Sequence, residues 1–309
     1  MRPSEFELIA RLFAPLATAP GAFGLTDDAA LLPARAGHEL IATTDALVEG
    51  VHFLSEDSPD SIAKKALRVN LSDLAAKGAE PAAYLLALSL PARLDLAWLE
   101  EFARGLGEDQ QAFGIALFGG DTTSTPGPLT LAITAFGFVP VGGMIRRAGA
   151  KPGDGVYVSG SIGDAGGGLA VLQGGSGPAE LVERYRLPMP RLALGLALRG
   201  IASAALDVSD GLIADLGHIA EVSGVRIVVE AARIPRSPAL RALWGDGNEA
   251  ILRAATAGDD YEIAFTVPPR DEIPAGVSRI GVVEKGAGIV LLDAEGREIA
   301  VPRAGYRHF

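Results

Sequence analysis

The chain has 309 residues, a length typical of two domains. Its 27 Lys and Arg residues against 38 Asp and Glu residues leave a formal net charge of −11, which argues against nucleic acids and anionic membranes as partners, because affinity for such surfaces comes mainly from basic side chains. The cysteine count of zero excludes disulfides, thiolate metal sites and cysteine nucleophiles, and it agrees with the cytoplasmic location that we predict.

Helices and strands alternate in the first 142 residues. Ser4 and Glu7 form a capping box that predicts a helix, and the acidic residues of this segment argue against a signal peptide. Further helices are predicted over 58–77 and 94–113, and strands over 29–32, 39–43, 84–90, 115–118 and 129–139. We expect the strand 39–43 to end in an acidic turn at Asp45, and the strand 115–118 to end at the turn 119–121. The most apolar window, 129–141, is too short to cross a bilayer.

A glycine-rich connector around 142–143 and 149–155 predicts a domain boundary, which gives domains of residues 1–142 and 143–309. In the second domain we predict a loop over 173–180, helices ending near 172, 201 and 223, and strands over 156–160, 225–230, 262–267, 278–283 and 288–292. The predicted fold class is α+β, with mixed sheets that helices cover on one face.

Acidic residues recur at predicted turns and on one apolar helix face. They are Asp27 with Asp28, Asp45, Asp73, Asp121, and Asp207 with Asp210. One such aspartate alone is most often a turn or cap residue. Several of them together would repel one another by ~4 kcal/mol per pair at ~4 Å and an effective dielectric constant of about 20, so a cation would have to hold them. Mg²⁺ prefers oxygen ligands, and Thr43, Thr44 and Ser209 add hydroxyl oxygens. The pattern indicates metal-bridged phosphate chemistry.

Other nucleotide and metal motifs are missing from the sequence. It contains neither a P-loop nor the catalytic loop of protein kinases. The glycine-rich run 159–168 follows a predicted strand but lacks the dinucleotide-binding spacing, so a tight turn is the better interpretation. No two histidines have the spacing of zinc ligands, although His52 follows Asp45 closely enough to contact a ligand.

Six internal motifs and the end of the chain carry a family resemblance. They are TTDALVEGVHF at 43–53, KALRVNLSDLAAKGAEP at 65–81, GGDTT at 119–123, RRAGAKPGDGVYVSG at 146–160, ALDVSDGL at 205–212, AGDDYEIAFT at 257–266 and the final GYRHF. Together they resemble the thiamine-monophosphate kinase family of the aminoimidazole ribonucleotide synthetase-like superfamily. The resemblance implies a two-domain ATP-binding fold, and a homodimer whose N-terminal sheets pair into a barrel. It also implies that ATP lies in a cleft between the domains.

The resemblance further implies roles for individual residues. Several Mg²⁺ ions would be held by Asp28, Thr43, Thr44, Asp45, Asp73, Asp121, Asp207 and Asp210. ATP would contact Gly120, Asp121, Arg147 (or its neighbour Arg146) and Ser209. Thiamine monophosphate would contact His52, Asp259 and Tyr306. The family usually has Gly-Asp-Asp where this chain has Thr26-Asp27-Asp28, and glutamate in place of Asp259.

The implied reaction is direct, in-line transfer of a phosphoryl group from ATP to thiamine monophosphate. A phosphate monoester has its second pKa near ~6 and is largely ionised at neutral pH, so no general base is expected. Two alternatives stay open at this point: another ATP-dependent enzyme of the superfamily, such as a ligase, or a nucleotide-binding dimer without catalytic activity. Superfamily members with a catalytic cysteine are excluded by the composition.

Overall fold

We describe the protein from a computed structural model that covers residues 4–270 and 272–306. The chain divides into two compact units, one built from the ranges 1–74 and 79–142 and the other from 75–78 and 143–309. We describe each unit by itself. Among the described residues no helix combines the length and the apolar character that a membrane crossing needs.

A four-stranded sheet forms the frame of the first unit. Its strands are β1 (His38–Val48), β2 (Glu80–Pro91), β3 (Ala116–Thr125) and β4 (Thr130–Pro140), in the order β1-β4-β2-β3. The pairs β1–β4 and β4–β2 are antiparallel and β2–β3 is parallel. The strands β1 and β3 are therefore the two edges of this sheet. Before β1 the chain forms α1 (Glu5–Leu8) and the short helical turns Ile9–Phe13, Ala14–Leu16 and Pro20–Leu25.

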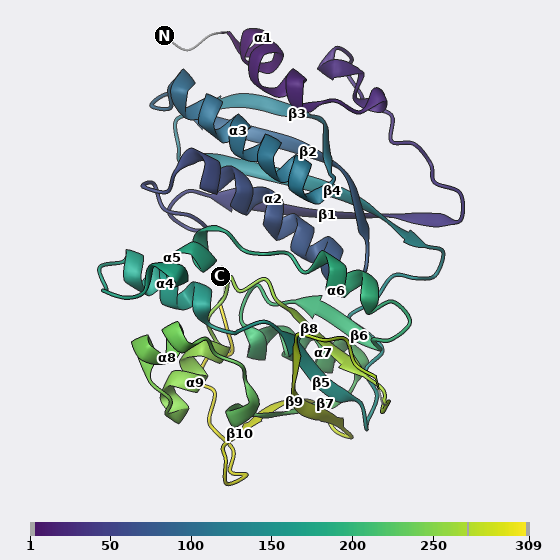
Figure 1. Ribbon diagram of the computed structural model, residues 1–309, viewed down its shortest axis with the longest axis vertical. Coiled ribbons are helices and arrows are strands. Elements are labelled where there is room, and N and C mark those ends of the chain that lie inside the picture. The colour runs from purple at the N-terminus through teal and green to yellow at the C-terminus, as the bar shows by residue number, and fades with distance from the viewer. Residues whose placement is uncertain (1–3, 271, 307–309) are drawn as a thin grey trace. The chain divides into compact units, whose positions relative to one another are not determined.

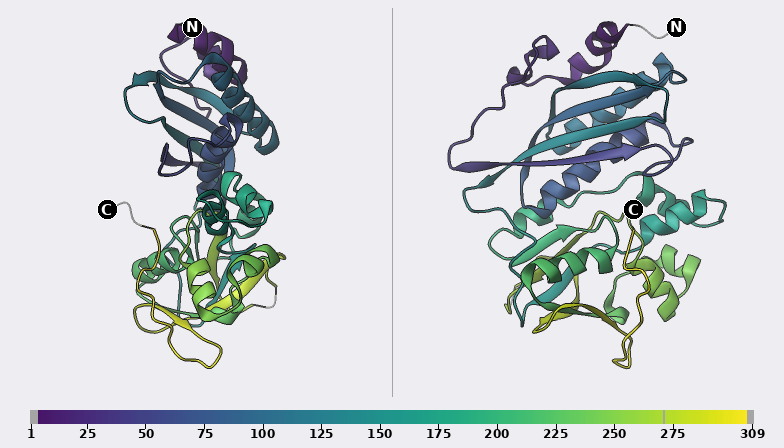
Figure 2. Two further views of the ribbon diagram at one scale, coloured as in Figure 1. Left: turned by 90° about the vertical axis from the view of Figure 1, so that its left-hand side faces the viewer. Right: turned by 180° about the vertical axis from the view of Figure 1, so that it is seen from behind.

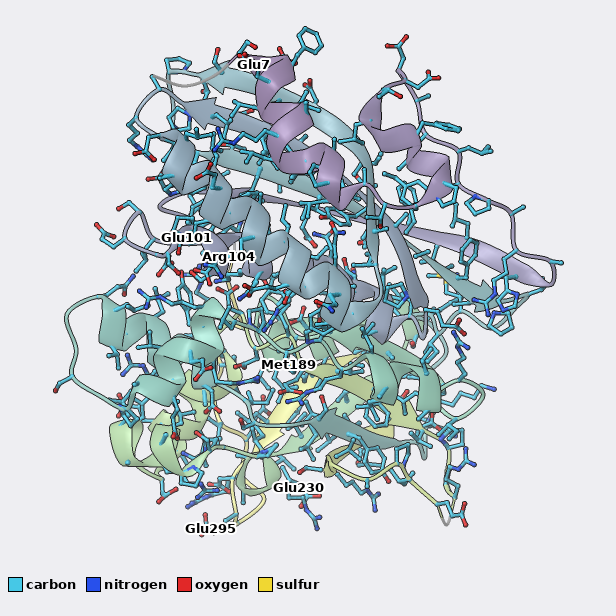
Figure 3. All side chains as sticks on the ribbon, turned by 45° about the horizontal axis from the view of Figure 1, so that its top comes forward. Glu7, Glu101, Arg104, Met189, Glu230 and Glu295 are labelled. Carbon is cyan, nitrogen blue, oxygen red and sulfur yellow. The ribbon has the colours of Figure 1, made fainter. Side chains whose placement is uncertain are left out.

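Two long helices, α2 (Pro59–Ala76) and α3 (Leu96–Phe113), cover one face of this sheet (Figures 1 and 2). Their apolar sides pack on alternate strand residues to give a core of fully buried side chains: Leu67, Leu71, Leu74, Leu99, Phe102, Leu106, Tyr84 and Ile133. The outward side of α3 carries charged residues that pair within the helix, such as Arg104 with Glu101 and Glu108 (Figure 3). Burial of apolar area on one side of α3 and solvation of charges on the other fix its orientation.

The opposite face of the sheet is open along β1. Leu40, Ala42, Thr44 and Ala46 alternate with less exposed residues and are themselves exposed. Leu40 retains 48% of its accessible surface. A sheet with one covered and one open face shows this period-two pattern of burial.

Three predictions for the first unit are wrong. The segment Ala29–Leu32 is not a strand, because its one backbone bond to a distant residue joins Leu31 N to Gly21 O and no ladder follows. Asp45 lies inside β1 rather than in a turn, since β1 pairs with β4 continuously from His38 to Val48. Asp121 likewise lies inside β3, which pairs with β2 as far as Thr125.

The second unit is built on a six-stranded mixed sheet in the order β10-β7-β9-β5-β8-β6. The strands are β5 (Gly155–Ser159), β6 (Ala204–Asp207), β7 (Arg226–Glu230), β8 (Ile263–Val267), β9 (Val277–Glu284) and β10 (Gly288–Leu292). The pair β7–β10 is parallel and the other pairs are antiparallel. The helices are α4 (Asp164–Leu172), α5 (Ala179–Arg186), α6 (Leu192–Ala197), α7 (Leu212–Ser223), α8 (Pro238–Trp244) and α9 (Asn248–Ala255). The sequence analysis did not identify α5, α8 or α9.

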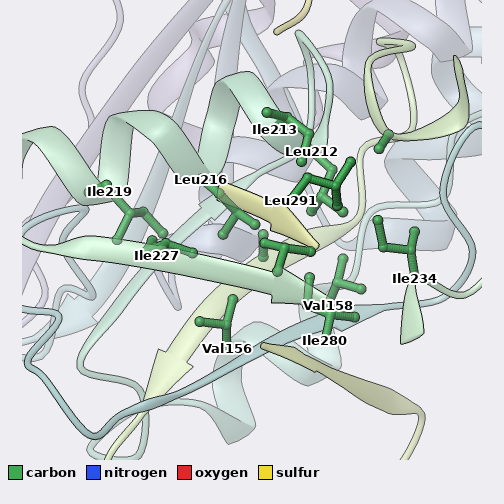
Figure 4. Packing of buried hydrophobic residues seen from close by; sticks show 14 of the residues in the cluster. Val156, Val158, Leu212, Ile213, Leu216, Ile219, Ile227, Ile234, Ile280 and Leu291 are labelled. Atoms are coloured by element: carbon green, nitrogen blue, oxygen red, sulfur yellow. The ribbon is translucent and has the colours of Figure 1, made fainter. Parts of the chain in front are cut away.

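Helix α7 supplies the largest part of this unit's core. Leu212, Leu216 and Ile219 of α7 lie in one buried cluster with Val158, Ile227 and Ile280 of the sheet (Figure 4). The first turn of α7 follows directly on the acidic segment 207–210. Packing of α7 therefore fixes the position of that segment.

Candidate functional site

A first acidic group lies where β1 faces α2. The hydroxyl of Thr43 donates a hydrogen bond to the carboxylate of Asp73, which lies near the end of α2. Asp45 is on the same face of β1, because side chains two residues apart in a strand share a face. Burial, and to a smaller extent the nearby Asp73 carboxylate, raises the pKa of Asp45 to about 6. A cation beside Asp45 and Asp73 would offset both effects.

Thr44 points to the other face of β1. Its hydroxyl donates to the carbonyl of Ile133 at 3.1 Å and accepts from the hydroxyl of Thr134 at 3.1 Å. The structure therefore brings Thr43, Asp45 and Asp73 together and keeps the side chain of Thr44 apart from them.

A second acidic group lines a cavity of about 740 Å³ beside β3. Asp27, Asp28 and Asp121 line it, together with apolar residues such as Phe13 and Leu85 and with threonines and glycines. Gly120 also lines the cavity, and a Cβ at this position would lie 1.9 Å from the carbonyl oxygen of Leu86. Only glycine allows β3 to approach β2 this closely while Asp121 keeps its place.

These two groups are separate in one copy of the chain. Asp45 pairs with Ile133 of β4, Ile133 pairs with Leu86 of β2, and Leu86 pairs with Gly120 of β3. Three inter-strand spacings separate the two ends of this row, about 14 Å at ~4.8 Å each. Asp121 is registered with Ala87, which is exposed, whereas Asp45 is registered with buried Ile133. The two groups thus lie on opposite edges and opposite faces of the sheet.

His52 lies in the turn that follows β1. Its ring Nδ1 accepts a hydrogen bond of 3.0 Å from the backbone N–H of Val48, and its carbonyl oxygen accepts one of 2.9 Å from the ammonium of Lys65. Lys65 is buried on α2. The sequence analysis included Lys65 in a motif without giving it a role.

A third group lies in the second unit, at the end of β6. Asp207 is the last residue of β6 and is buried, and Ser209 and Asp210 follow it. The carboxylate of Asp215, on α7, accepts from the backbone N–H groups of Ser209, Asp210 and Gly211 at 3.0–3.1 Å. Burial, followed by the nearby Asp210, raises the pKa of Asp215 to about 7, although the three N–H groups oppose this effect. By binding three backbone N–H groups, Asp215 therefore fixes the conformation of the chain around Ser209 and Asp210.

The residues predicted to contact the substrate in this unit meet the same loop. The backbone N–H of Asp259 donates to Ser209 O at 2.8 Å, and that of Tyr306 donates to Asp210 O at 2.9 Å. Asp259 and Tyr261 have φ of 67° and 51°, a region that few non-glycine residues occupy. Strained backbone of this kind persists only where the surrounding structure fixes it, and it occurs often at ligand sites. Ser209, Asp210, Asp259 and Tyr306 are thus brought together.

The two candidate arginines lie on the segment that precedes β5. Arg146 and Arg147 are both exposed, and the carbonyl of Arg146 accepts from the backbone N–H of Ala205, the second residue of β6. This bond ties the arginine segment to the strand that leads to Asp207. Both guanidinium groups keep access to solvent.

The side chains gathered here suit hard divalent cations. Each acidic group offers carboxylate oxygens, the hydroxyl of Thr43 bonds to Asp73, and Ser209 precedes Asp210 in the chain. Asp210, Asp215 and His218 also hold one potential ligand atom each within 4.8 Å of one another. Asp215 and His218 were not among the predicted ligands. Asp215 follows Asp210 by five residues within an apolar helix, a weak signal that the sequence did carry.

Comparison with known proteins shows which family the chain belongs to. Residues 26–139 match the model of the AIR synthase related protein N-terminal domain, and residues 151–294 match that of the C-terminal domain. A thiamine-monophosphate kinase of Caulobacter vibrioides is 47% identical over 99% of this chain and 91% of its own length. One of Salmonella typhimurium is 42% identical over 100% of this chain and 99% of its own.

Solved structures give the same result. The crystal structure of thiamine-monophosphate kinase from Stenotrophomonas maltophilia matches with a TM-score of 0.83 and 42% identity, over 97% of this chain and 99% of the other. The structure of AaThiL complexed with AMPPCP and TMP matches with a TM-score of 0.81 and 31% identity, over 94% and 97% of the two chains. A hydrogenase maturation protein, HypE, shares the fold at 21% identity. By motifs, fold and whole-length identity, the chain belongs to the thiamine-monophosphate kinase family.

Proposed function

We propose that this protein transfers the γ-phosphoryl group of ATP directly to thiamine monophosphate, giving thiamine diphosphate and ADP. One observation carries this conclusion. A relative that matches 94% of this chain at 31% identity was solved with AMPPCP, an ATP analogue, and TMP. The acidic groups around β1, β3 and β6 support the same conclusion, since two phosphate-bearing substrates need positive charge between them.

The carboxylates define where divalent ions would be held. Asp45 and Asp73 form one set, Asp28 and Asp121 a second, and Asp207 with Asp210 a third, with the hydroxyl of Thr43 beside the first. For Thr44 the proposal is limited to its backbone carbonyl, because its side chain faces away from Asp45. Bound Mg²⁺ ions would neutralise the phosphate groups and stabilise charge on the transferred phosphoryl group.

The remaining candidates bind and orient the substrates. We assign Gly120, Asp121, Arg147 and Ser209 to ATP, and His52, Asp259 and Tyr306 to thiamine monophosphate. Arg147 is exposed and bears a permanent charge, which suits it to the phosphate groups of ATP. No side chain is assigned the role of general base, because the attacking phosphate oxygen is already ionised at neutral pH. Location in the cytoplasm stays a prediction.

The proposal includes a homodimer, which the sheet of the first unit supports. Its edges β1 and β3 and its open face with Leu40 and Thr44 are the features that a second copy would cover if two sheets paired into a barrel. Within one copy the Asp45 and Asp121 groups lie about 14 Å apart across the sheet. We propose that the Asp121 group of one copy completes the Asp45 group of the other.

The test is to incubate the protein with MgATP and thiamine monophosphate and to quantify both products. We expect thiamine diphosphate and ADP in equal amounts. Thiamine itself should not be phosphorylated, because its neutral hydroxyl would need a general base. The protein should also acquire no label from γ-labelled ATP alone. ADP release without thiamine diphosphate would overturn the proposal and point to another ATP-dependent reaction of the superfamily.

A further inference from the structure

Backbone hydrogen bonds close the turn that carries His52. The backbone N–H of His52 donates to Val48 O at 2.9 Å, and that of Gly50 donates to Phe53 O at 2.8 Å. Glu49 and Phe53 form a β-bridge, and the Phe53 side chain is 1% exposed. The turn is therefore an ordered extension of β1.

The hydrogen bond at the ring of His52 selects one tautomer. A backbone N–H can only donate, so the Nδ1 atom that accepts from Val48 carries no proton. The neutral imidazole consequently has its proton on Nε2, which is a hydrogen-bond donor. His38 shows the opposite arrangement, because its Nδ1 lies 2.9 Å from the carbonyl oxygen of Ala36, which can only accept. An Nε2–H donor at His52 suits an anionic ligand such as a phosphate ester.

Lys65 supports this turn from beneath. Its ammonium donates to His52 O at 2.9 Å, and only 2% of the residue is exposed. Burying an ammonium is costly, so a buried lysine at this position indicates that its charged end is needed for the contacts that it makes, of which the bond to His52 O is one. The adjacent Lys64 lies nearer the surface, where it forms ion pairs with Asp60 at 3.5 Å and with Glu108 at 2.6 Å.

One rigid helix links the His52 turn to the first acidic group. Lys65 and Asp73 both belong to α2, eight residues apart, which is about 12 Å along the axis at ~1.5 Å per residue. Lys65 contacts the turn after β1, while Asp73 contacts Thr43 within β1. A helix held at these two points fixes the spacing between the His52 turn and the carboxylates Asp45 and Asp73.

We propose that Lys65 is a positioning residue that holds the 49–53 turn so that His52 presents Nε2–H to the phosphate of the acceptor substrate. This inference rests on the proposed function, in which His52 contacts thiamine monophosphate. Lys65 acts through His52. Loss of the Lys65 ammonium should therefore weaken the binding of the acceptor substrate more than the binding of ATP.

The first test reads the tautomer directly and needs no activity. In a protein with ¹⁵N-labelled histidine rings, multiple-bond ¹H–¹⁵N correlation spectra should show Nε2–H for His52 and Nδ1–H for His38. His52→Gln and His38→Gln assign the two signals. Lys65→Met should convert the His52 pattern to a mixture of tautomers and leave His38 unchanged, whereas Lys64→Met should change neither. An Nδ1–H tautomer at His52 in the unmodified protein, or an unaltered His52 pattern in Lys65→Met, would overturn the proposal.

The second test is kinetic. Lys65→Met should raise KM for thiamine monophosphate about tenfold or more, the scale of one lost charge-assisted hydrogen bond, with KM for ATP changed less than about twofold. Lys65→Arg keeps a charged donor and should retain most of the affinity, and Lys64→Met is the matched control. In a cycle with His52→Ala, the double variant should be no worse than His52→Ala alone, because both changes remove the same interaction.

The outcomes separate the two hypotheses. Equal increases of both KM values with a lowered melting temperature, or losses that multiply in the double variant, would show that Lys65 is merely structural. If the unmodified protein makes no thiamine diphosphate, the proposed function fails, and the tautomer spectra still decide whether Lys65 positions His52.

Discussion

Thr43, on β1, donates its hydroxyl hydrogen to the carboxylate of Asp73, which lies 30 residues further along the chain on α2. This bond joins strand and helix at the place where Asp45 also lies, so that two carboxylates and a hydroxyl share one small volume. The pKa of Asp45 is raised there by burial and, to a smaller extent, by the Asp73 carboxylate. Several expectations about activity and stability depend on it.

Asp45→Asn should reduce kcat by about 10³-fold or more, because it removes a carboxylate proposed to hold a cation against the transferred phosphoryl group. The melting temperature of the metal-free protein should not fall. Glu56→Gln, at an exposed position in the loop after β1, is the control and should retain full activity. Comparable kcat values for Asp45→Asn and the control would contradict the assignment of Asp45.

Metal-free stability should depend on pH through Asp45. Its pKa is about 6 in the folded chain against an ordinary value of 3.8, so the folded state binds the proton more tightly than the unfolded state. Protonation of Asp45 thus favours folding, and the free energy of unfolding falls as pH rises from about 4 to about 6. In a chelator at pH 7, Asp45→Asn should therefore be more stable than the parent chain by about 1–3 kcal/mol. The measurement is the free energy of urea unfolding of both proteins at pH 4.5 and 7. A stability advantage of Asp45→Asn over the parent chain that is smaller at pH 7 than at pH 4.5 would contradict this prediction.

Subunit mixing tests the proposed sharing of sites across a dimer. Asp45→Asn and Asp121→Asn should each be inactive alone. Denatured together in equal amounts and refolded, they should regain about a quarter of the parent activity, because half of the dimers are mixed and each mixed dimer contains one intact site. Refolding each variant separately before mixing is the control. No recovery after joint refolding would show that each site is formed within one chain.

Gly120→Ala should destabilise the protein by about 2–4 kcal/mol, since the new Cβ would lie 1.9 Å from Leu86 O and backbone must move to relieve the clash. Gly127→Ala is the matched control, because there the nearest atom, the Thr125 hydroxyl, lies at 3.4 Å. Chemical unfolding of both variants measures the difference. Equal stabilities would show that β2 and β3 can separate at little cost.

Motifs and composition were sufficient to predict the family, and this prediction is confirmed by relatives that match almost the whole chain. The division between strand and turn was harder to predict. Asp45 and Asp121 were expected in turns because aspartate disfavours strands. Their positions depend instead on long ladders with β4 and β2, and pairing between distant segments leaves little trace in the local sequence.

The supporting residues were hidden for a different reason. Asp215 and Lys65 lie on helices among apolar neighbours, where a charged residue resembles an ordinary surface position of an amphipathic helix. Only the structure shows that both are buried and that each bonds the backbone of a loop carrying a candidate site residue. Helices α8 and α9 are short and depend on packing around Leu240 and Ala254.

The ladder between β1 and β4 runs without a bulge from His38 opposite Pro140 to Val48 opposite Thr130. In such a ladder successive side chains alternate between the two faces of the sheet, so that odd-numbered and even-numbered residues of β1 lie on opposite faces. Deleting one residue between Leu40 and Thr43 would turn Thr44 toward α2 and Asp45 away from it, although no residue of the site had been replaced. Evolution can therefore exchange amino acids along β1 far more freely than it can change its length, and variation in length among relatives should concentrate in the connecting loops.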